Sequence, residues 1–402
     1  MKKTQWVKAR HRVIRNLFCP FFYLYSTWKY NIHIEQFKEQ ENRPYLILYN
    51  HQTAFDQFFV GMSIKQPVYY LATEDIFSMG WLSSVIRFLV APIPIKKQTL
   101  DISSIKTCMR VAKEGGTIAI APEGNRTFSG KTEYINPSIA SLAKKLNFPI
   151  LLYRIEGGYG VHPRWSDVVR KGKMRAHVSD VIKPEEYEKL SKEELFERIN
   201  QGLYVDEAND NNVFHHTKRA EYLERAIYVC PYCGLSTFKS HKDTLKCEKC
   251  SKTVIYDSST RLQGVGFTLP FSFVSEWYDY QKEYMNQLDV TAYATDPIYE
   301  EEVSLFEVVV YKKKRRIRKH STIHLYGNRI IVDETQSDRL DFVFDEISAV
   351  TILGKNKINI YTGEKVYQVT GGKRFNALKY VHIFNRYKNI SRGDTDGKFL
   401  GL

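Results

Sequence analysis

The chain lacks any apolar run long enough to span a membrane as a helix. Its longest stretch without a charged residue, Leu262 to Ser275, is shorter than the roughly 18 to 20 apolar residues that a bilayer needs. Cysteine is scarce, with six in 402 residues, and four of the six form two close pairs. This spacing is typical of a metal site in a reducing compartment and unlike a disulfide framework. The sequence therefore excludes a polytopic membrane protein and a disulfide-stabilised scaffold.

Acidic residues are also in short supply. The chain has 45 aspartates and glutamates against 59 lysines and arginines, so its net charge is +14. An excess of this size predicts an anionic partner, which is nucleic acid, anionic lipid or a phosphorylated substrate. The hydrophobic fraction of 43% excludes a disordered chain, and the length allows two or three domains with cores of their own.

Residues 1–40 combine basic and aromatic side chains. Six basic residues and no acidic one occur up to Arg15, and an aromatic stretch from Leu17 to Trp28 follows without the small residues of a signal-peptide cleavage site. We interpret this part as a membrane-interfacial segment; the alternative is an ordinary helix that packs on the core. Together with the cysteine usage, it predicts a cytoplasmic protein that is peripheral on the inner face of the membrane.

Residues 41–217 alternate between strand-like and helix-like patterns. Four apolar runs are typical of buried strands: 45–49, 68–72, 117–121 and 149–155. Helices are predicted between them at 54–65, 81–89, 103–114 and 138–146. This alternation predicts an α/β domain with a mixed, largely parallel sheet flanked by helices. In such sheets the functional groups usually lie at the carboxyl ends of the strands.

Two further sections follow. Residues 228–255 contain the paired cysteines, and residues 265–395 form a β-rich domain that begins with a helix at 275–287 and ends in a helix at 375–387. Short strands bounded by turn residues and closed by one helix indicate a small barrel or curled sheet. In shape alone, this last section resembles a pleckstrin-homology or GRAM-like domain.

The segment "YLILYNHQTAFDQF" (45–58) places His51 and Asp56 between a predicted strand and a predicted helix. His51 admits three interpretations: a chance surface residue, a core histidine bonded to the backbone, or a general base oriented by Asp56. A helix N-terminus disfavours a second positive charge, so the imidazole is expected to stay neutral and to accept a proton. Asp56 would then hold the other ring nitrogen and stabilise the imidazolium as it forms. The spacing by itself occurs often by chance.

A second group of suitable residues lies in "TIAIAPEGNRTFSG" (117–130), directly after another strand. Gly124 permits a ligand to approach the backbone, and Arg126 offers phosphate a permanently charged, bidentate fork. Glu123 stands beside them, and Lys97 in "PIPIKK" adds a second cation. A neutral base with converging cations suits a phosphorylated alcohol as acceptor.

These blocks resemble those of the glycerolipid acyltransferases, particularly the 1-acylglycerol-3-phosphate acyltransferases, over about residues 45–206. "NHQTAFD" is similar to the family block N-H-x-S-x-x-D, and "APEGNRTFSG" is similar to F-P-E-G-T-R-S. "PIPIKK" matches the intervening block, and "NFPILLYRI" fits the fourth block. The departures are Thr53 for serine, Ala121, Asn125 and Thr127 in the second block, and Lys97 for the usual arginine.

The resemblance implies an O-acyltransferase that moves a fatty acyl group from acyl-CoA or acyl-carrier protein to a lysophospholipid hydroxyl. The acceptor would be 1-acylglycerol-3-phosphate, giving phosphatidic acid. The resemblance implies catalysis by His51 and Asp56, without a catalytic metal, and it implies substrate binding by Lys97, Glu123, Gly124 and Arg126. Because lysine lacks the guanidinium fork, another lysolipid or a glycolipid is the alternative acceptor. Outside the enzyme class, the alternative is a scaffold on a degenerate acyltransferase domain, whose catalytic pair would be broken; here the pair is intact.

The remaining motifs are a cysteine quartet and a basic run. Cys230, Cys233, Cys247 and Cys250 form a C-x2-C-x13-C-x2-C pattern, which predicts a structural zinc ribbon because four thiolates leave no open coordination position. "YKKKRRIRKH" holds seven basic residues between positions 312 and 319. That run is a solvated hairpin, a nucleic-acid site or a patch for an anionic membrane surface. For an enzyme with a lipid substrate we favour the membrane and do not expect nucleic acid as a partner.

Overall fold

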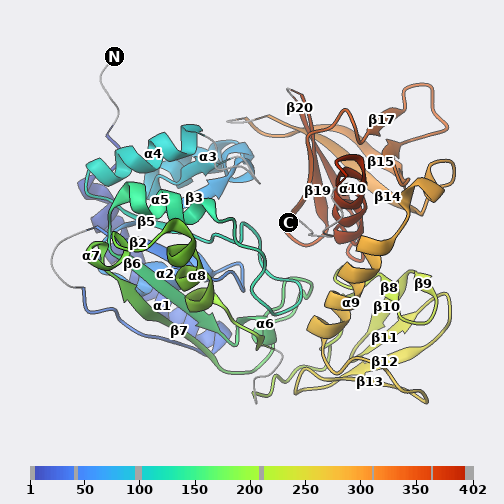
Figure 1. Ribbon diagram of the computed structural model, residues 1–402, viewed down its shortest axis with the longest axis horizontal. Helices are drawn as coiled ribbons and strands as arrows, with labels where there is room; N and C mark the ends of the chain where they lie inside the picture. Colours follow the sequence, from blue (N-terminus) through green and yellow to red (C-terminus); the bar gives the residue numbers. More distant parts are fainter. Residues whose placement is uncertain are drawn as a thin grey trace. The chain divides into compact units, whose positions relative to one another are not determined.

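The computed structural model describes residues 5–39, 44–95, 102–207, 212–309, 312–363 and 365–393, without the side chains of residues 74 and 75. The chain divides into two compact units. Unit 1 comprises Met1–Arg164 and Val168–His216, and unit 2 comprises Trp165–Asp167 and Thr217–Leu400. Figure 1 shows the chain with labels on many of its elements.

Unit 1 is built on a seven-stranded sheet with the order β1-β7-β6-β2-β5-β3-β4. The strands are β1 (Ile32–Ile34), β2 (Leu46–Tyr49), β3 (Val68–Thr73), β4 (Ile93–Ile95), β5 (Thr117–Ile120), β6 (Ile150–Glu156) and β7 (Met174–Ile182). Only β6 and β7 pair antiparallel; β2 is parallel to both β5 and β6, with Leu46 opposite Ile118 and Ile150. The prediction of a mixed, largely parallel sheet is confirmed.

Helices cover both faces of this sheet. They are α1 (Ala9–Tyr30), α2 (Asp56–Ser63), α3 (Trp81–Val90), α4 (Ile102–Lys113), α5 (Ser138–Leu146), α6 (Gly158–Val161), α7 (Pro184–Tyr187) and α8 (Lys192–Leu203), with the 3-10 helix η1 (Glu74–Ser78). Leu46 and Leu48 of the central strand face a core shared with α4, α5 and α8, and Ile47 and Tyr49 face a second core with α1 and α2. A strand buried on both faces is the physical reason for the uninterrupted apolar run at 45–49.

Sequence reasoning predicted α2 to α5 but not β7 or α8. Strand β7 mixes exposed and buried positions without strict alternation, so its period-2 signal is weak. Helix α8 did carry a readable signal, because Ser191 and Glu194 form a reciprocal capping box at its start.

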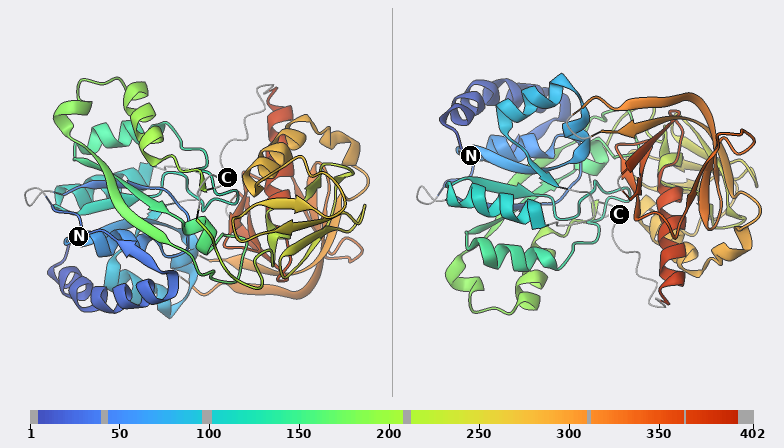
Figure 2. Two further views of the ribbon diagram at one scale, coloured as in Figure 1. Left: turned by 90° about the horizontal axis from the view of Figure 1, so that it is seen from below. Right: turned by 90° about the horizontal axis from the view of Figure 1, so that it is seen from above.

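Helix α1 is amphipathic and contains Pro20. It buries His11, Ser26 and Tyr30 against unit 1. On its other side, one stripe of apolar side chains is exposed: Val13, Leu17, Phe21, Leu24 and Trp28. Helix α3 lies beside it (Figure 2), where the Arg10 guanidinium sits 4.0 Å from the Phe88 ring centroid. No helix among the described residues is both long and apolar enough to cross a membrane.

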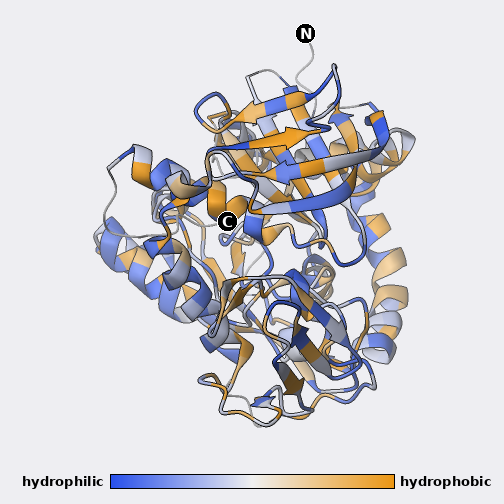
Figure 3. Cartoon of the chain, turned by 90° about the vertical axis from the view of Figure 1, so that its right-hand side faces the viewer, coloured by the Kyte–Doolittle hydropathy of each residue, from blue (hydrophilic) through white to orange (hydrophobic). Residues whose placement is uncertain are grey.

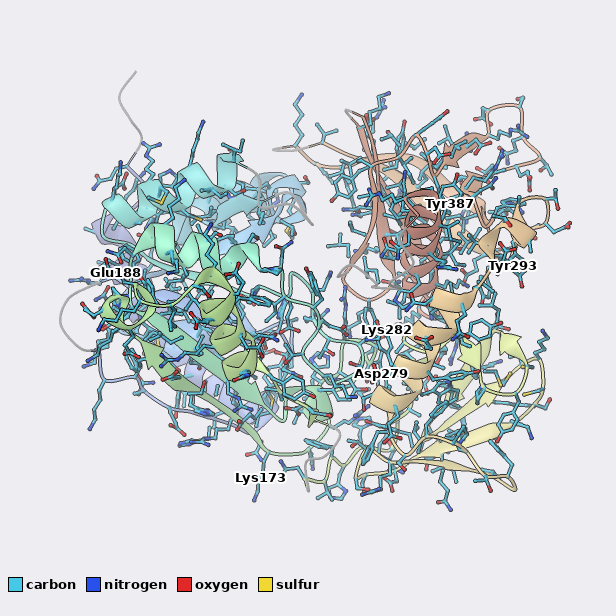
Figure 4. The ribbon with its side chains drawn as sticks, in the orientation of Figure 1. Lys173, Glu188, Asp279, Lys282, Tyr293 and Tyr387 are labelled. Atoms are coloured by element: carbon cyan, nitrogen blue, oxygen red, sulfur yellow. The ribbon has the colours of Figure 1, made fainter. Side chains whose placement is uncertain are left out.

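Unit 2 begins with a small ribbon. Its strands are β8 (Val229–Cys230), β9 (Gly234–Leu235), β10 (Phe238–His241), β11 (Thr244–Cys247), β12 (Thr253–Tyr256) and β13 (Leu262–Gly264), and the 3-10 helix η3 (Leu223–Arg225) precedes them. Strands β10 to β13 form an antiparallel sheet in chain order, while β8 pairs with β9. Helix α9 (Val274–Gln287) follows, on which Asp279 and Lys282 pair at 3.2 Å (Figure 4).

The rest of unit 2 is a curled antiparallel sheet with the order β17-β16-β15-β14-β20-β19-β18. Its elements are η4 (Val290–Tyr293), β14 (Tyr299–Val308), β15 (Arg315–Leu325), β16 (Arg329–Val332), β17 (Leu340–Val343), β18 (Ala349–Leu353), β19 (Lys357–Thr362), β20 (Lys365–Gly371) and α10 (Leu378–Ser391). Apolar and polar residues are interspersed along these strands (Figure 3), as expected where one face is buried. Irregular register between β14 and β15 near Leu305 bends the sheet. The predicted curled sheet with a closing helix is confirmed.

Candidate active site and cysteine cluster

The turn between β2 and α2 brings His51 and Asp56 together. Nδ1 of His51 lies 2.8 Å from Oδ2 of Asp56, whose side chain is fully buried while that of His51 is 21% exposed. His51 lies outside the helix and Asp56 is its first residue, so the chain can fold back and join the two side chains. This is the geometry that the general-base interpretation requires.

The Asp56 carboxylate is held in one orientation by its own loop. It accepts hydrogen bonds from the backbone N–H of Gln52 at 2.7 Å and of Thr53 at 2.9 Å, and from the Thr53 hydroxyl at 2.7 Å. Thr53, at the position of the expected serine, therefore supplies a hydroxyl that orients the carboxylate. Because a carboxylate oxygen only accepts, Nδ1 of His51 must carry the hydrogen, which leaves Nε2 with a free lone pair.

Burial lowers the pKa of His51 below its ordinary value. The hydrogen bond and charge of Asp56 oppose this change, while the positive charges of Arg126 and Arg164 add to it. The net direction is downward, so the imidazole is neutral near pH 7 and able to accept a proton. The neutral state expected for His51 thus follows from its lowered pKa, which is caused by burial and by the charges of two arginines.

Glu123 acts on the backbone of the same region. Its Oε1 accepts from the His51 backbone N–H at 2.7 Å, and its Oε2 accepts from the Glu133 backbone N–H at 2.8 Å. The side chain is 5% exposed, and burial raises its pKa well above the ordinary value. Both oxygens are therefore already engaged in fixing two loops. Gly124 beside it has a φ of +68°, which glycine adopts without strain.

Arg126 presents a buried donor without a partner. Its Nη1 has no hydrogen-bond partner among the residues that the structure describes. Burial lowers the pKa of Arg126, and Asp56 and Tyr30 oppose that change, but a guanidinium stays charged. An unpaired cation near a neutral histidine is an arrangement suited to an anionic ligand. Lys97, the second predicted cation, lies outside the described residues.

Two residues that sequence reasoning did not single out support this site. Arg164 is 2% exposed, donates from Nη1 to the Arg126 carbonyl at 2.9 Å and stacks 4.3 Å above the Phe128 ring. The Asn50 amide bridges β2 to β6 by donating to the Ile155 carbonyl and accepting from its N–H. Asn50 stood in the recognised motif and could have been found there, whereas nothing local marks Arg164 as buried.

The four ribbon cysteines also converge. The sulfur atoms of Cys230, Cys233, Cys247 and Cys250 all lie within 4.8 Å of one another. Cys230 and Cys250 are 3.7 Å apart, and Cys233 and Cys247 are 3.6 Å apart, too long for disulfides. Four sulfurs at these separations fit a tetrahedral ion with thiolate ligands, so the cluster can bind a metal.

Comparison with known proteins shows what the sequence of this chain is similar to. Residues 29–155 match the family model of the acyltransferases. The 1-acyl-sn-glycerol-3-phosphate acyltransferase of Bacillus subtilis (strain 168) is 22% identical over 169 residues, which are 41% of this chain and 81% of that protein. The chloroplastic enzyme BAT2 of Brassica napus is 22% identical over 163 residues, 40% of this chain and 46% of that protein. The crystal structure of PlsC, the 1-acyl-sn-glycerophosphate acyltransferase of Thermotoga maritima, aligns with a TM-score of 0.42 and 19% identity over 48% of this chain and 78% of that chain.

The chain thus carries a domain of the acyltransferase family, and the protein is an acyltransferase enzyme. Within that family the chain is similar to proteins named 1-acyl-sn-glycerol-3-phosphate acyltransferases. The matches cover less than half of the chain, and the family model ends before the cysteine ribbon begins.

Proposed function

We propose that this enzyme transfers a fatty acyl group from acyl-CoA or acyl-carrier protein to 1-acylglycerol-3-phosphate, giving phosphatidic acid. The observation that carries the proposal is the neutral His51, tied to buried Asp56 and lying in the field of Arg126. The names of the relatives in Bacillus and Brassica support the same reaction.

The roles of the chain's residues follow from their atoms. Nε2 of His51 accepts the proton of the acceptor hydroxyl, and the oxygen attacks the thioester carbonyl carbon. A carbon–oxygen bond forms, the carbon–sulfur bond breaks, and the imidazolium returns its proton to the leaving thiolate. Asp56 holds the ring and stabilises its positive charge meanwhile.

Substrate binding is divided among the nearby groups. Arg126 holds the phosphate of the acceptor, with Lys97 as the second cation, and Gly124 gives access to the backbone. We assign Glu123 chiefly a positioning role, because its two oxygens already accept the backbone N–H groups of His51 and Glu133.

A panel of acceptors tests the substrate. Labelled acyl-CoA and acyl-carrier protein are each offered with 1-acylglycerol-3-phosphate, other lysophospholipids and a glycolipid acceptor. We expect transfer to 1-acylglycerol-3-phosphate to exceed transfer to acceptors without a phosphate monoester at least tenfold, since Arg126 would lose a charge-assisted hydrogen bond with the latter. Transfer only to a glycolipid, or to no acceptor, would contradict this assignment.

We also propose that unit 1 binds the surface of anionic membranes through α1 and α3. Leu17, Phe21 and Trp28 on α1 are each more than 60% exposed, and Trp81 on the adjacent α3 is 78% exposed. Lys8, Arg12 and other basic residues occupy the N-terminal part of the same segment. Apolar side chains beside cations are typical of a helix that lies in the headgroup region.

Replacing the exposed tryptophans tests this surface. Trp28→Ser and Trp81→Ser should each weaken binding to anionic vesicles by roughly tenfold or more, the loss expected for one buried aromatic side chain. Vesicle sedimentation measures the effect, and Tyr204→Ser, an exposed aromatic on neither helix, serves as the matched control. Equal binding by all three variants would exclude α1 and α3 as the contact surface.

In unit 2 we propose a structural zinc ion at the cysteine cluster and a pleckstrin-homology or GRAM-like role for the β-rich section.

The basic run lies at the start of β15, where Arg315 pairs with Glu307 and Arg318 with Asp333. Lys313 and Lys319 are exposed. The net positive charge of this basic run is therefore smaller than its sequence implies. We propose anionic lipid as the partner of the run. A preference for DNA over anionic vesicles would favour the nucleic-acid alternative.

A further inference from the structure

Unit 1 contains a buried tyrosine hydroxyl for which the described residues provide no hydrogen-bond partner. Tyr30, the last residue of α1, is 1% exposed, and its hydroxyl makes no hydrogen bond to any residue that the structure describes. Buried polar groups are normally paired, and one left unpaired lowers the stability of the fold. A hydroxyl kept at this cost calls for a physical reason.

The Tyr30 ring packs beside the turn that carries the candidate site. The Tyr30 ring is fixed by Phe55 and Phe59, with centroids 5.3 and 5.8 Å away, and Phe55 directly precedes Asp56. Burial raises the pKa of Tyr30 well above its ordinary value; Tyr25 and Asp56 act in the same direction, and Arg126 opposes them. Tyr30 in turn acts on the pKa of Arg126. The phenol is thus a neutral donor in the electrostatic field of both Asp56 and Arg126.

The missing partner must be an acceptor of hydrogen bonds. Asp56 does not fill this role, because its oxygens accept from His51, Gln52 and Thr53. Nη1 of Arg126 is likewise buried and has no hydrogen-bond partner in the described part of the chain. Two buried donors that both lie in the electrostatic field of Asp56, one of them cationic, match an oxyanion with several acceptor oxygens. A phosphate monoester is such a group.

We propose that the Tyr30 hydroxyl and Nη1 of Arg126 together bind the phosphate of the acceptor. The inference rests on the proposed function and deepens it, because it adds a binding residue that lies outside the recognised motifs. It also gives α1 two roles, since the helix that carries the exposed apolar stripe supplies a group to the acceptor site.

The test is Tyr30→Phe, which removes one oxygen atom and keeps the ring contacts. KM for 1-acylglycerol-3-phosphate should rise about 10- to 100-fold, the loss expected for a hydrogen bond to a charged group, while kcat changes less than about threefold. The melting temperature should stay equal or rise, because the variant no longer buries an unpaired hydroxyl. A lower melting temperature with unchanged KM would show a purely structural role and overturn the proposal.

Tyr187→Phe is the matched control. Tyr187 is also 1% exposed, but its hydroxyl donates to the Phe148 carbonyl at 2.9 Å, so its loss should lower the melting temperature and leave KM unchanged. The double variant Tyr30→Phe/Arg126→Gln should raise KM by less than the product of the two single effects, because both residues bind one group. If the increase in KM of the double variant equals the product of the two single increases, the two residues do not bind the same phosphate.

A binding assay separates this inference from the proposed reaction. sn-Glycerol 3-phosphate should raise the melting temperature of the wild type, and Tyr30→Phe should need roughly tenfold more ligand for the same rise. If the wild type transfers no acyl group yet shows this Tyr30-dependent binding, the proposed reaction fails and the phosphate site stands. If glycerol 3-phosphate protects both proteins equally, the inference fails whatever the activity.

Discussion

His51→Ala should lower acyl transfer by about 100- to 10,000-fold, the range expected for loss of a general base. The variant removes Nε2, the only ring nitrogen free to accept a proton, since Nδ1 is bonded to Asp56. The fold should persist, because the backbone N–H of residue 51 can still donate to Glu123 as it does in the wild type. Initial rates with saturating acyl donor measure the loss, and circular dichroism checks the fold.

The matched control is His33→Ala. His33 is exposed in the middle of β1, so its removal should leave the rate within about twofold. Asp56→Asn should resemble His51→Ala, because an amide cannot accept from all the donors that Asp56 now binds. Full activity in His51→Ala would refute the assignment of His51 as the base.

The pH dependence follows from the same histidine. Burial lowers the pKa of His51 from 6.5, and protonation removes the lone pair, so kcat/KM should fall with a midpoint below about pH 6.5. The sign for stability is the same: the unfolded chain binds the proton more readily, so the His51 contribution to the free energy of unfolding decreases as pH falls below 6.5. An acid limb centred above pH 6.5 would contradict a buried neutral histidine.

The second large effect is expected at the cysteine cluster. The purified protein should contain one zinc ion per chain, and Cys247→Ser should lose it together with the structure of the ribbon. A segment of this size has little core, and structural zinc in comparable peptides binds with roughly 10 to 16 kcal/mol. Metal analysis gives the stoichiometry, and limited proteolysis between residues 228 and 255 reports unfolding of the ribbon.

Cys19→Ser is the control for this experiment, since Cys19 lies on α1 outside the quartet. It should retain the metal and the resistance of the ribbon to protease. Removal of zinc by a strong chelator should reproduce the effect of Cys247→Ser. A ribbon that is metal-free and still protected would show that the four thiols pack without an ion.

Local sequence determined most of the elements of both units. The predicted helix at 138–146 coincides with α5 (Ser138–Leu146), and the predicted strand at 117–121 differs from β5 (Thr117–Ile120) by one residue. These segments follow from periodicity, because a helix repeats its buried face every 3.6 residues and a strand every two. The cysteine spacing and the blocks around His51 and Arg126 were likewise readable, since their residues lie close together in the chain.

Tertiary structure alone decided which distant residues surround the His51–Asp56 pair. Tyr30, Glu123 and Arg164 come from separate parts of unit 1, and each acts through a bond or charge that no local pattern contains. Burial of Arg164, the unpaired Tyr30 hydroxyl and the occupied Glu123 oxygens all depend on how the chain packs around the ends of β2 and β5. The sequence by itself determined the chemistry available at this site, and packing determined its protonation state, its orientation and the donors left free for a ligand.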